Sequence, residues 1–274
     1  MLFCLFFGTL VSNWIMMVLL MEVTLFTFLF MLFEYNSVSY SSSGVKYFFS
    51  QTLGSISLLL AGLYYMVFVV VDSYFGMGFL MAGLCLKLGI FPMHFWVVPT
   101  SMELPYFMLG VLGVGMKVLP LMVLSAVCMH IDSILFLYIM LMLGSMSMVM
   151  GLSLGLSNMF IRGILGASSI THSGWFFMAS VSKVLFWYFL LYSATLLMVL
   201  LSMIALFYWA SSINLIALAG LPPFGVFFGK LLVLINYYQL NLPLVFIVPA
   251  LLTSVFSMIY YLKFSFSFFL SGSK

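Results

Sequence analysis

Charge is what this sequence has least of. Of its 274 residues, eight are Lys or Arg and five are Asp or Glu, while 66% are hydrophobic. A soluble domain has about 25% charged residues, so this composition excludes a water-exposed surface of ordinary size. Alternating ten-residue strand patterns are also missing, whereas apolar runs near twenty residues recur. The sequence therefore predicts an all-α polytopic membrane protein.

Cysteine and basic clusters are scarce as well. The three cysteines lie far apart, without CxxC spacing or a partner histidine: Cys4, Cys85 and Cys128. A metal or iron–sulfur site is therefore not expected. The net charge of +3 is small and dispersed, which argues against a nucleic-acid partner. We find no redox-cofactor ligands and no nucleophile–base pair, so no cofactor is expected to bind this chain.

Polar residues divide the chain into ten apolar segments without a second domain, so residues 1–274 are interpreted as one transmembrane domain. The segments are Met1–Val11, Trp14–Phe33, Gln51–Val71, Phe75–Val98, Tyr106–Met129, Ser133–Gly155, Ile164–Val181, Leu185–Trp209, Leu215–Tyr238 and Leu242–Phe269. The first is short for a full crossing. The Ser-rich stretch Glu34–Gly44 is predicted to be a loop. Glycines 110, 113 and 115 are expected to allow close helix packing.

Grouping the segments in fives reveals a possible repeat. The fourth segment of the first group carries Lys87 and then Pro92, and that of the second carries Pro222 and Pro223 before Lys230. Proline removes a backbone donor and breaks a helix, so both segments are predicted to be broken helices. An odd number of spans inverts the second unit. Two inverted five-helix repeats are therefore predicted, over about residues 1–130 and 133–269.

Four ionisable residues lie inside apolar segments: Glu22, Lys87, Lys117 and Lys230. A charge at the centre of a bilayer costs at least about 2.5–3.5 kcal/mol, so proton or ion movement is the leading hypothesis. Snorkelling to the membrane surface is the alternative, but it requires a position near a helix end. Lys117 is eleven residues from Tyr106, about 16 Å along a helix, and is too deep for it.

These residues could pass a proton along the membrane. Burial favours the neutral form of a lysine, and a nearby carboxylate favours the charged form. At about 4 Å and an effective dielectric constant near 20, such a pair is coupled by about 4 kcal/mol, which is enough to switch protonation. Approach and withdrawal of Glu22 would therefore load and unload Lys87. His94 and His172 are further relay candidates, although a structural role remains open for both.

Basic residues are unequally shared between the two sides of the predicted topology. Counting alternate loops places Lys46, Glu103, Arg162, Lys263 and Lys274 on one side and Lys183 on the other. The positive-inside tendency predicts that the first side faces the cytoplasm or, in a mitochondrion, the matrix. The N-terminus has no Arg-rich presequence, and the bias toward Phe, Met, Leu and Ser resembles that of organelle-encoded proteins.

Four stretches of the sequence resemble one family in order along the chain: Lys46–Gln51, Lys87–Trp96, Ser168–Trp175, and Leu218–Phe224 followed by Lys230. This is the chain 2 family of mitochondrial NADH–ubiquinone oxidoreductase, an antiporter-like subunit in the membrane arm of respiratory complex I. The chain departs from the family pattern in its shorter N-terminus, its early C-terminal end and Gly163, which replaces a second basic residue.

The resemblance implies a proton-translocating subunit of a translocase in the mitochondrial inner membrane, encoded in the organelle. Glu22 and Lys87 would form the carboxylate–lysine pair, Lys117 the central relay and Lys230 the terminal lysine. NAD, FMN, iron–sulfur clusters and ubiquinone would bind partner subunits. The other membrane-arm subunits and a cardiolipin-containing bilayer would surround the chain.

Two alternatives from other classes share parts of this pattern. A freestanding cation/proton antiporter would use the same lysines and broken helices, and it would not co-purify with an NADH-oxidising assembly. A purely structural subunit would tolerate loss of the lysines without loss of pumping. Both remain open at the level of the sequence.

Overall fold

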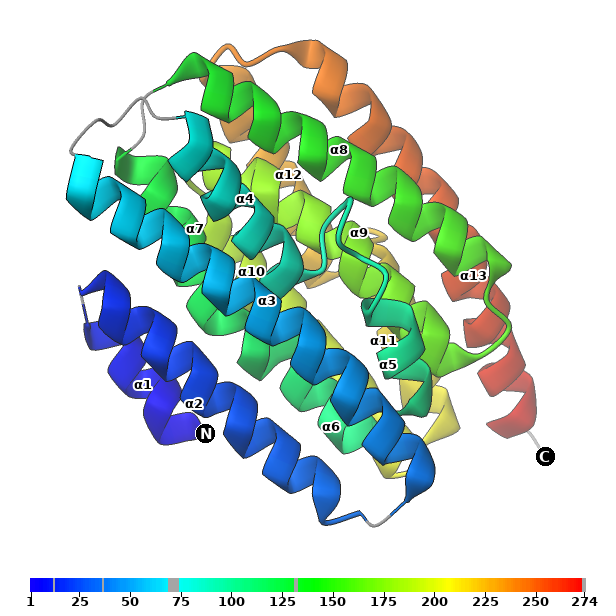
Figure 1. Ribbon diagram of the computed structural model, residues 1–274. Helices are drawn as coiled ribbons and strands as arrows, with labels where there is room; N and C mark the ends of the chain where they lie inside the picture. The colour runs from blue at the N-terminus through cyan, green and yellow to red at the C-terminus, as the bar shows by residue number, and fades with distance from the viewer. Residues whose placement is uncertain (12, 36, 69–73, 131–132, 273–274) are drawn as a thin grey trace.

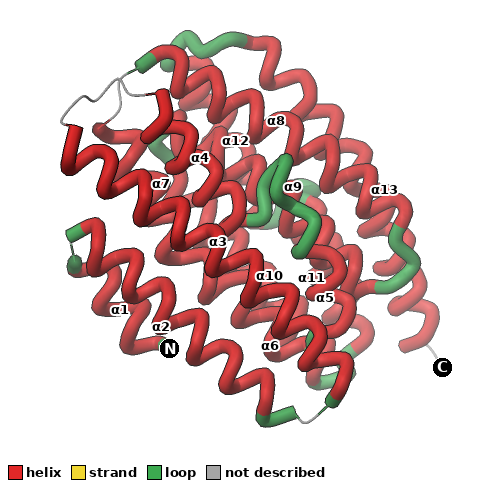
Figure 2. Tube along the Cα trace, viewed as in Figure 1, coloured by secondary structure: helices red, strands yellow, loops and turns green. Residues whose placement is uncertain are grey.

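The computed structural model describes residues 1–11, 13–35, 37–68, 74–130 and 133–272. All secondary-structure elements in these ranges are helical, which confirms the all-α prediction. The long helices lie side by side along one common direction and form a single bundle (Figure 1). The tube view shows that short loops join them at the two ends of the bundle (Figure 2).

The helices, in chain order, are α1 (Leu2–Leu10), α2 (Trp14–Phe33), α3 (Val38–Phe68), α4 (Tyr74–Leu88), α5 (Val97–Glu103), α6 (Tyr106–Gly110), the π-helix η1 (Val111–Gly115), α7 (Met116–His130), α8 (Ile134–Ser157), α9 (Ile161–Val181), α10 (Leu185–Ile204), α11 (Tyr208–Ala219), α12 (Gly225–Gln239), the 3₁₀-helix η2 (Leu244–Phe246) and α13 (Ile247–Gly272). The described residues thus hold more helices than the ten predicted segments, because four segments are divided. Two of them are broken by a loop, as α4 with α5 and α11 with α12, and two change helix type, as α6 with η1 and α7 and as η2 with α13.

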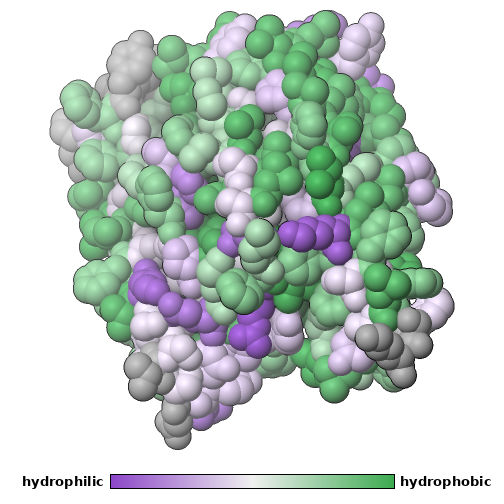
Figure 3. Space-filling model, turned by 90° about the vertical axis from the view of Figure 1, so that its right-hand side faces the viewer, coloured by the Kyte–Doolittle hydropathy of each residue, from purple (hydrophilic) through white to green (hydrophobic). Residues whose placement is uncertain are grey.

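Within the described residues, five helical stretches are long and apolar enough to cross a membrane: Trp14–Phe33, Tyr106–Met129, Ile134–Ser157, Leu185–Ile204 and Leu244–Ser271. A 20-residue helix is about 30 Å long, which matches the hydrocarbon core of a bilayer. The surface seen from one side is largely hydrophobic, with hydrophilic residues gathered in a limited area (Figure 3). The chain is therefore a multi-pass membrane protein.

Both predicted helix breaks are confirmed. The first separates α4 from α5, and Gly89 ends α4 in a left-handed conformation with φ of 69°. The Ile90 N–H closes that end with a 2.9 Å bond to the Cys85 carbonyl, a common way to satisfy a helix C-terminus. The second break separates α11 from α12, and Gly220, with φ of 82°, ends α11 in the same way.

The predicted loop at Glu34–Gly44 is wrong over most of its length, because α3 already begins at Val38. The Ser42 hydroxyl donates to the Ser39 carbonyl at 2.9 Å, and the Ser43 hydroxyl donates to the Tyr40 carbonyl at 2.8 Å. These polar side chains are thus satisfied on their own helix. The helix therefore continues beyond its apolar part.

The described charged residues that topology counting placed on one side do meet at one end of the bundle. Three contacts show this: Lys46 Nζ lies 2.7 Å from Glu103 Oε1, the Arg162 guanidinium lies 4.8 Å from the centre of the Tyr106 ring, and Lys263 Nζ lies 3.5 Å from Met159 Sδ. We call this the basic end. Burial opposes ionisation of Glu103, but hydrogen bonds from Lys46 and Ser42 outweigh it and lower the pKa of the carboxyl. Lys274 lies outside the described residues.

Candidate functional site

Helix α9 forms the centre of the site. Every residue from Gly163 to Val181 is buried, although the helix carries serines, a threonine and a histidine. It packs against α5, α7, α8, α10, α12 and α13. Buried polar groups require hydrogen-bond partners, so a polar helix in this position organises the groups around it. The candidate lysines approach α9 from α4, α7 and α12.

The first of these lysines is paired with the predicted carboxylate. Lys87 Nζ lies 3.5 Å from Glu22 Oε1, and 3% of the lysine side chain is exposed against 23% of the glutamate side chain. Lys87 lies in the last turn of α4, where the partial negative charge of the helix end stabilises a cation. Glu22 belongs to α2. The structure thus brings together the first two predicted site residues.

Lys117 is held directly on α9. Its Nζ donates to the Ser169 carbonyl and to the Ser173 hydroxyl, both at 3.1 Å. The ammonium also faces two aromatic rings, with Phe176 at 5.6 Å and Tyr192 at 5.8 Å from the ring centres. Cation–π attraction of this kind stabilises a charge where water is excluded. Lys117 is therefore held in the interior of the bundle and does not reach the surface.

A π-helical turn precedes Lys117, which the sequence analysis did not predict. This turn is the element η1, and Pro120 follows it inside α7. An i→i+5 turn inserts an extra residue, and such turns often occur at functional sites. Gly110 and Gly113 in this region pack against Leu200 and Leu196 of α10, as expected for small residues in a helix contact.

Ser173 connects Lys117 with the end of the first broken helix. Its hydroxyl accepts from Lys117 and lies within donating distance of two carbonyls, Ser169 O at 2.7 Å and Leu88 O at 3.1 Å. Leu88 is the last residue of α4 and directly follows Lys87. One side chain on α9 therefore joins the surroundings of two of the buried lysines.

Lys230 occupies the second helix break. Its Nζ donates to the Ala219 carbonyl at 3.1 Å and faces the Trp175 ring at 5.8 Å. Ala219 is the last residue of α11, so this ammonium also lies at a negative helix end. Lys87 and Lys230 thus both belong to broken helices, Lys87 in the last turn before the first break and Lys230 in the half-helix after the second.

The two candidate histidines differ in their surroundings. His172 Nδ1 lies 2.8 Å from the Tyr188 hydroxyl, and its ring lies 4.6 Å from that of Tyr192. It lines a small cavity together with Lys230, and the Tyr192 ring beside it also faces Lys117. His94 is buried between Phe91 and Phe95, and the described contacts do not join it to any of the lysines.

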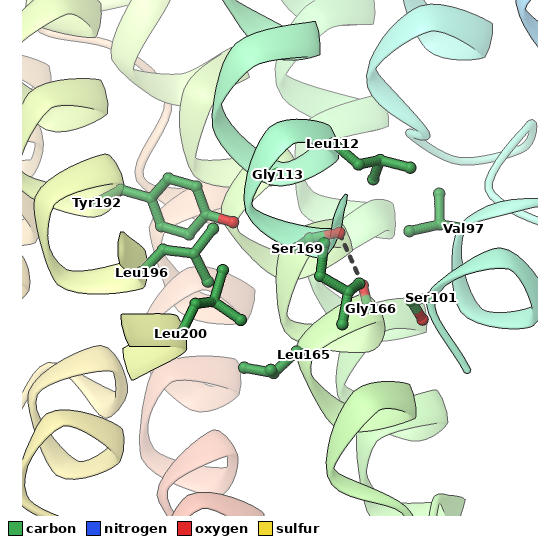
Figure 4. Close-up of a pocket in the computed structure, with 11 residues that line it drawn as sticks. Val97, Ser101, Leu112, Gly113, Leu165, Gly166, Ser169, Tyr192, Leu196 and Leu200 are labelled. Atoms are coloured by element: carbon green, nitrogen blue, oxygen red, sulfur yellow. Dashed lines mark hydrogen bonds between the residues drawn. The ribbon is translucent and has the colours of Figure 1, made fainter. Parts of the chain in front are cut away.

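A small cavity of about 20 Å³ lies beside Lys117's acceptor residue, between α5, α6, η1, α9 and α10 (Figure 4). Leu112, Leu165, Leu196 and Leu200 make most of its wall apolar. Ser169 lines the cavity, and its hydroxyl donates to the Gly166 carbonyl at 2.8 Å. The apolar wall limits access of water to this side of Lys117.

Sequence reasoning did not identify Ser169, Ser173, Tyr188 and Tyr192 as site residues. They carry no charge, and serine is common throughout this chain. The available signal was the Ser168–Trp175 stretch, which is unusually polar for a segment between apolar runs. Its polar residues were assigned no role because their partners come from other helices.

Gly220→Ala is expected to disturb the second break. Alanine in a left-handed conformation costs about 1–2 kcal/mol, and its Cβ would lie 2.9 Å from Lys230 Nζ. We expect a lower thermal stability of the subunit and displacement of the ammonium. Gly225→Ala is the matched control, because its added Cβ meets only Leu191, at 3.4 Å. Equal melting temperatures for the two variants would contradict this role of Gly220.

The fold and the buried charges define a polytopic helical membrane protein with a polar interior. Residues 11–213 match the family model described as NADH:quinone oxidoreductase/Mrp antiporter, TM, and the chain belongs to this family. The chain is similar to NADH-ubiquinone oxidoreductase chain 2 of Albinaria caerulea, with 36% identity over 95% of this chain and 84% of that one. The same-named chain of Anopheles gambiae is 30% identical over 97% of this chain and 84% of its own length.

Solved structures with the same fold come from larger membrane assemblies. A chain of respiratory complex I from Thermus thermophilus with bound aureothin matches with a TM-score of 0.78 and 21% identity, over 92% of this chain and 65% of that chain. A chain of the Mrp complex from Dietzia sp. DQ12-45-1b matches with a TM-score of 0.76 and 16% identity, over 92% of this chain and 56% of that chain. This chain thus spans about half to two thirds of those chains. The resemblance inferred from the sequence motifs is confirmed by the family match and the curated relatives.

Proposed function

We propose that this chain is a proton-translocating, antiporter-like subunit of NADH:ubiquinone oxidoreductase in the mitochondrial inner membrane. Family membership and the relatives named NADH-ubiquinone oxidoreductase chain 2 support this function. The chain then serves a translocase without a redox centre of its own. NADH oxidation, flavin and iron–sulfur electron transfer and quinone reduction take place in partner subunits, and the neighbouring membrane-arm subunits are its direct partners.

One observation carries the proposal: the Ser173 hydroxyl lies between Lys117 and the carbonyl that ends the Lys87 helix. A hydroxyl can accept a proton on its oxygen and donate the proton it already carries. Ser173 is therefore suited to pass protons between Lys117 and the end of the Lys87 helix without any net change in its own protonation, and Leu88, whose carbonyl it reaches, directly follows Lys87.

The relay starts at the Glu22–Lys87 pair. While the carboxylate lies near, the charged form of Lys87 is stabilised; when the carboxylate is neutralised or withdrawn, the buried ammonium favours release of its proton. That proton passes toward Lys117, and the positive charge gained there repels further charge on Lys87. His172, which is hydrogen-bonded to Tyr188, continues the path toward Lys230, because His172 and Lys230 line the same small cavity.

The two broken helices also support an inverted-repeat organisation over residues 1–130 and 133–269. In each half, the fourth span is divided, as α4 with α5 and α11 with α12. Transporters with inverted repeats place such broken helices around a central ion pathway. In this proposal the first half supplies Lys87 and Lys117, and the second half supplies Lys230 and α9.

A freestanding antiporter is the second candidate, because the matched family includes Mrp antiporters. Two relatives that share 30% identity or more over nearly the whole chain carry the oxidoreductase name, and they favour the oxidoreductase subunit over the antiporter. Purification under mild conditions separates the two. Recovery within an NADH-oxidising assembly supports the subunit, and recovery of an active chain without that assembly would contradict it.

Ser173→Ala is expected to slow proton-coupled NADH oxidation about threefold to tenfold while leaving assembly intact. The substitution removes one of the two acceptors of Lys117 and the side-chain donor to the Leu88 carbonyl. Turnover and acidification are measured with the intact complex in sealed vesicles. Ser147→Ala is the control, because this serine is equally buried but donates only to the Gly144 carbonyl of its own helix, at 2.7 Å. Equal activities of the two variants would exclude the bridging role.

A further inference from the structure

The C-terminal end of α4, at the first helix break, is capped by side chains from other parts of the fold. The Leu86 carbonyl accepts from Trp96 Nε1 at 3.1 Å and from Gln51 Nε2 at 3.4 Å. The carbonyls of Cys85 and Leu88 have the partners described above. The last four carbonyls of a helix have no donor on their own helix, so such partners satisfy them. Three of the last four carbonyls of α4 are thus occupied by groups other than its buried lysine.

The buried lysines beside the two helix breaks differ in what their ammonium groups contact. Lys230 Nζ donates to the Ala219 carbonyl, the last of α11, at 3.1 Å. The described hydrogen bonds at the end of α4 do not include Lys87 Nζ, which lies 3.5 Å from Glu22 Oε1 instead. A lysine near a helix C-terminus can donate to terminal carbonyls that are free. Occupation of these carbonyls therefore leaves the carboxylate as the partner of Lys87.

One face of α3 holds this end of α4. Tyr47, Gln51 and Gly54 are separated by four and three residues, so they lie on the same face of the helix. A Cβ added at Gly54 would lie 3.2 Å from Leu86 Cβ and 3.2 Å from Lys87 Cγ. Glycine at this position therefore lets α3 approach the end of α4 closely, so that the Gln51 amide reaches the Leu86 carbonyl.

The indole of Trp96 is oriented from the same face of α3. Its ring lies 5.4 Å from the ring of Tyr47 in an edge-to-face arrangement, and Tyr47 is buried. Such aromatic pairs stabilise one geometry beyond the effect of burial. The Tyr47 ring also lies 4.9 Å from that of Phe28 on α2, the helix that carries Glu22. Contacts around Tyr47 thus join α2 and α3 to the residue that precedes α5.

Both donors are placed where solvent cannot readily replace them. Gln51 is 4% exposed, and Trp96 is partly buried. A buried amide is costly unless its hydrogen-bonding groups find partners. The two side chains come from opposite sides of the break, because Gln51 belongs to α3 and Trp96 precedes α5. Their shared acceptor is the carbonyl next to Lys87 in the chain.

We propose that the side chains of Gln51 and Trp96 keep the ammonium of Lys87 directed at its carboxylate partner. They act as positioning residues, and the proposal rests on the proposed proton-translocating function. By occupying the Leu86 carbonyl, they remove an acceptor that competes with Glu22. Without them the ammonium turns to the free helix end, as the lysine at the second break does. Lys87 then no longer responds to neutralisation or withdrawal of the carboxylate.

Trp96→Phe tests this role, because it removes the indole N–H and keeps an aromatic ring beside Tyr47. Turnover and acidification are measured with the intact complex in sealed vesicles, both in the original chain and in the Glu22→Gln chain. In the original chain we expect about threefold lower turnover, the effect of one lost hydrogen bond. In the Glu22→Gln chain we expect no further loss, because the charge at which Lys87 is directed is already gone.

Trp14→Phe is the matched control. It also removes one indole N–H from a main-chain carbonyl, that of Leu58 within α3, at 3.0 Å. This bond does not involve the end of α4. The variant should keep turnover within about twofold of the original chain. Any loss that it causes should combine with that of Glu22→Gln as independent effects do.

Gln51→Leu removes the other donor and is expected to show the same dependence on Glu22. It keeps the test decisive if Trp96→Phe does not assemble. Losses that add fully to that of Glu22→Gln would show helix capping alone and overturn the positioning role. If Glu22→Gln is impaired while Trp96→Phe and Gln51→Leu are normal or additive, only the positioning role is refuted. Normal pumping by Glu22→Gln itself would contradict the proposed function.

Discussion

Replacing Lys117 with methionine is expected to leave the complex assembled but to lower proton-coupled NADH oxidation at least about tenfold, or about 1.4 kcal/mol in activation free energy. Methionine fills nearly the same volume and suits the aromatic surroundings formed by Phe176 and Tyr192. The Ser169 carbonyl is not left unpaired, because the Ser173 hydroxyl lies 2.7 Å from it. The loss is therefore attributed to the missing proton carrier. Turnover and vesicle acidification measure it.

Lys183→Met is the matched control for this experiment. Lys183 is exposed and lies beyond the end of α9 that is opposite to the basic end, so the same change in charge occurs outside the relay. It should leave turnover within about twofold of the original protein. If Lys117→Met retained normal pumping at normal membrane potential, Lys117 would have no relay role.

Glu22→Gln is expected to impair turnover severalfold more than Glu22→Asp. The amide keeps the shape of the side chain but removes the charge that lies 3.5 Å from Lys87 Nζ. At an effective dielectric constant near 20, opposite charges about 4 Å apart interact by about 4 kcal/mol. Aspartate keeps the charge at a greater distance and should retain more of the activity. The measurement is NADH–quinone turnover against pH.

Glu103→Gln tests whether any loss of a carboxylate has this effect. Glu103 also pairs with a lysine, at 2.7 Å, but its pair is exposed at the basic end, and exposed pairs contribute about 0–1 kcal/mol. Its removal should therefore change turnover little. If the two Glu22 variants had equal effects, packing and not charge would explain the role of Glu22.

Much of the fold could be predicted from local features of the sequence. Prolines 92, 222 and 223 remove backbone donors and are preceded by glycines 89 and 220, which take left-handed conformations, so the two helix breaks could be predicted from the sequence. Proline alone is not sufficient, because Pro120 lies inside α7. The prediction of a loop over Glu34–Gly44 was wrong because serine has two structural roles in a membrane protein. It can mark a polar turn, or it can donate to its own helix and continue it.

The candidate site could be predicted only in part. Charge in an apolar segment identified Glu22, Lys87, Lys117 and Lys230, because burial of a charge is costly wherever the partner lies. The partners themselves depend on tertiary packing. Ser173 acquires its position only when α9 packs against α7 and reaches the C-terminal end of α4, and the π-helical turn before Lys117 has no distinct sequence pattern.

The number of protons moved per NADH oxidised tests the central claim most directly. It is measured in sealed vesicles with the intact complex that contains either the original chain or the double variant Lys117→Met with Lys230→Met. The proposed relay predicts that the double variant assembles fully, and that it either moves fewer protons per NADH or oxidises NADH at a strongly reduced rate. An unchanged proton yield at an unchanged rate would contradict proton transfer through these buried lysines.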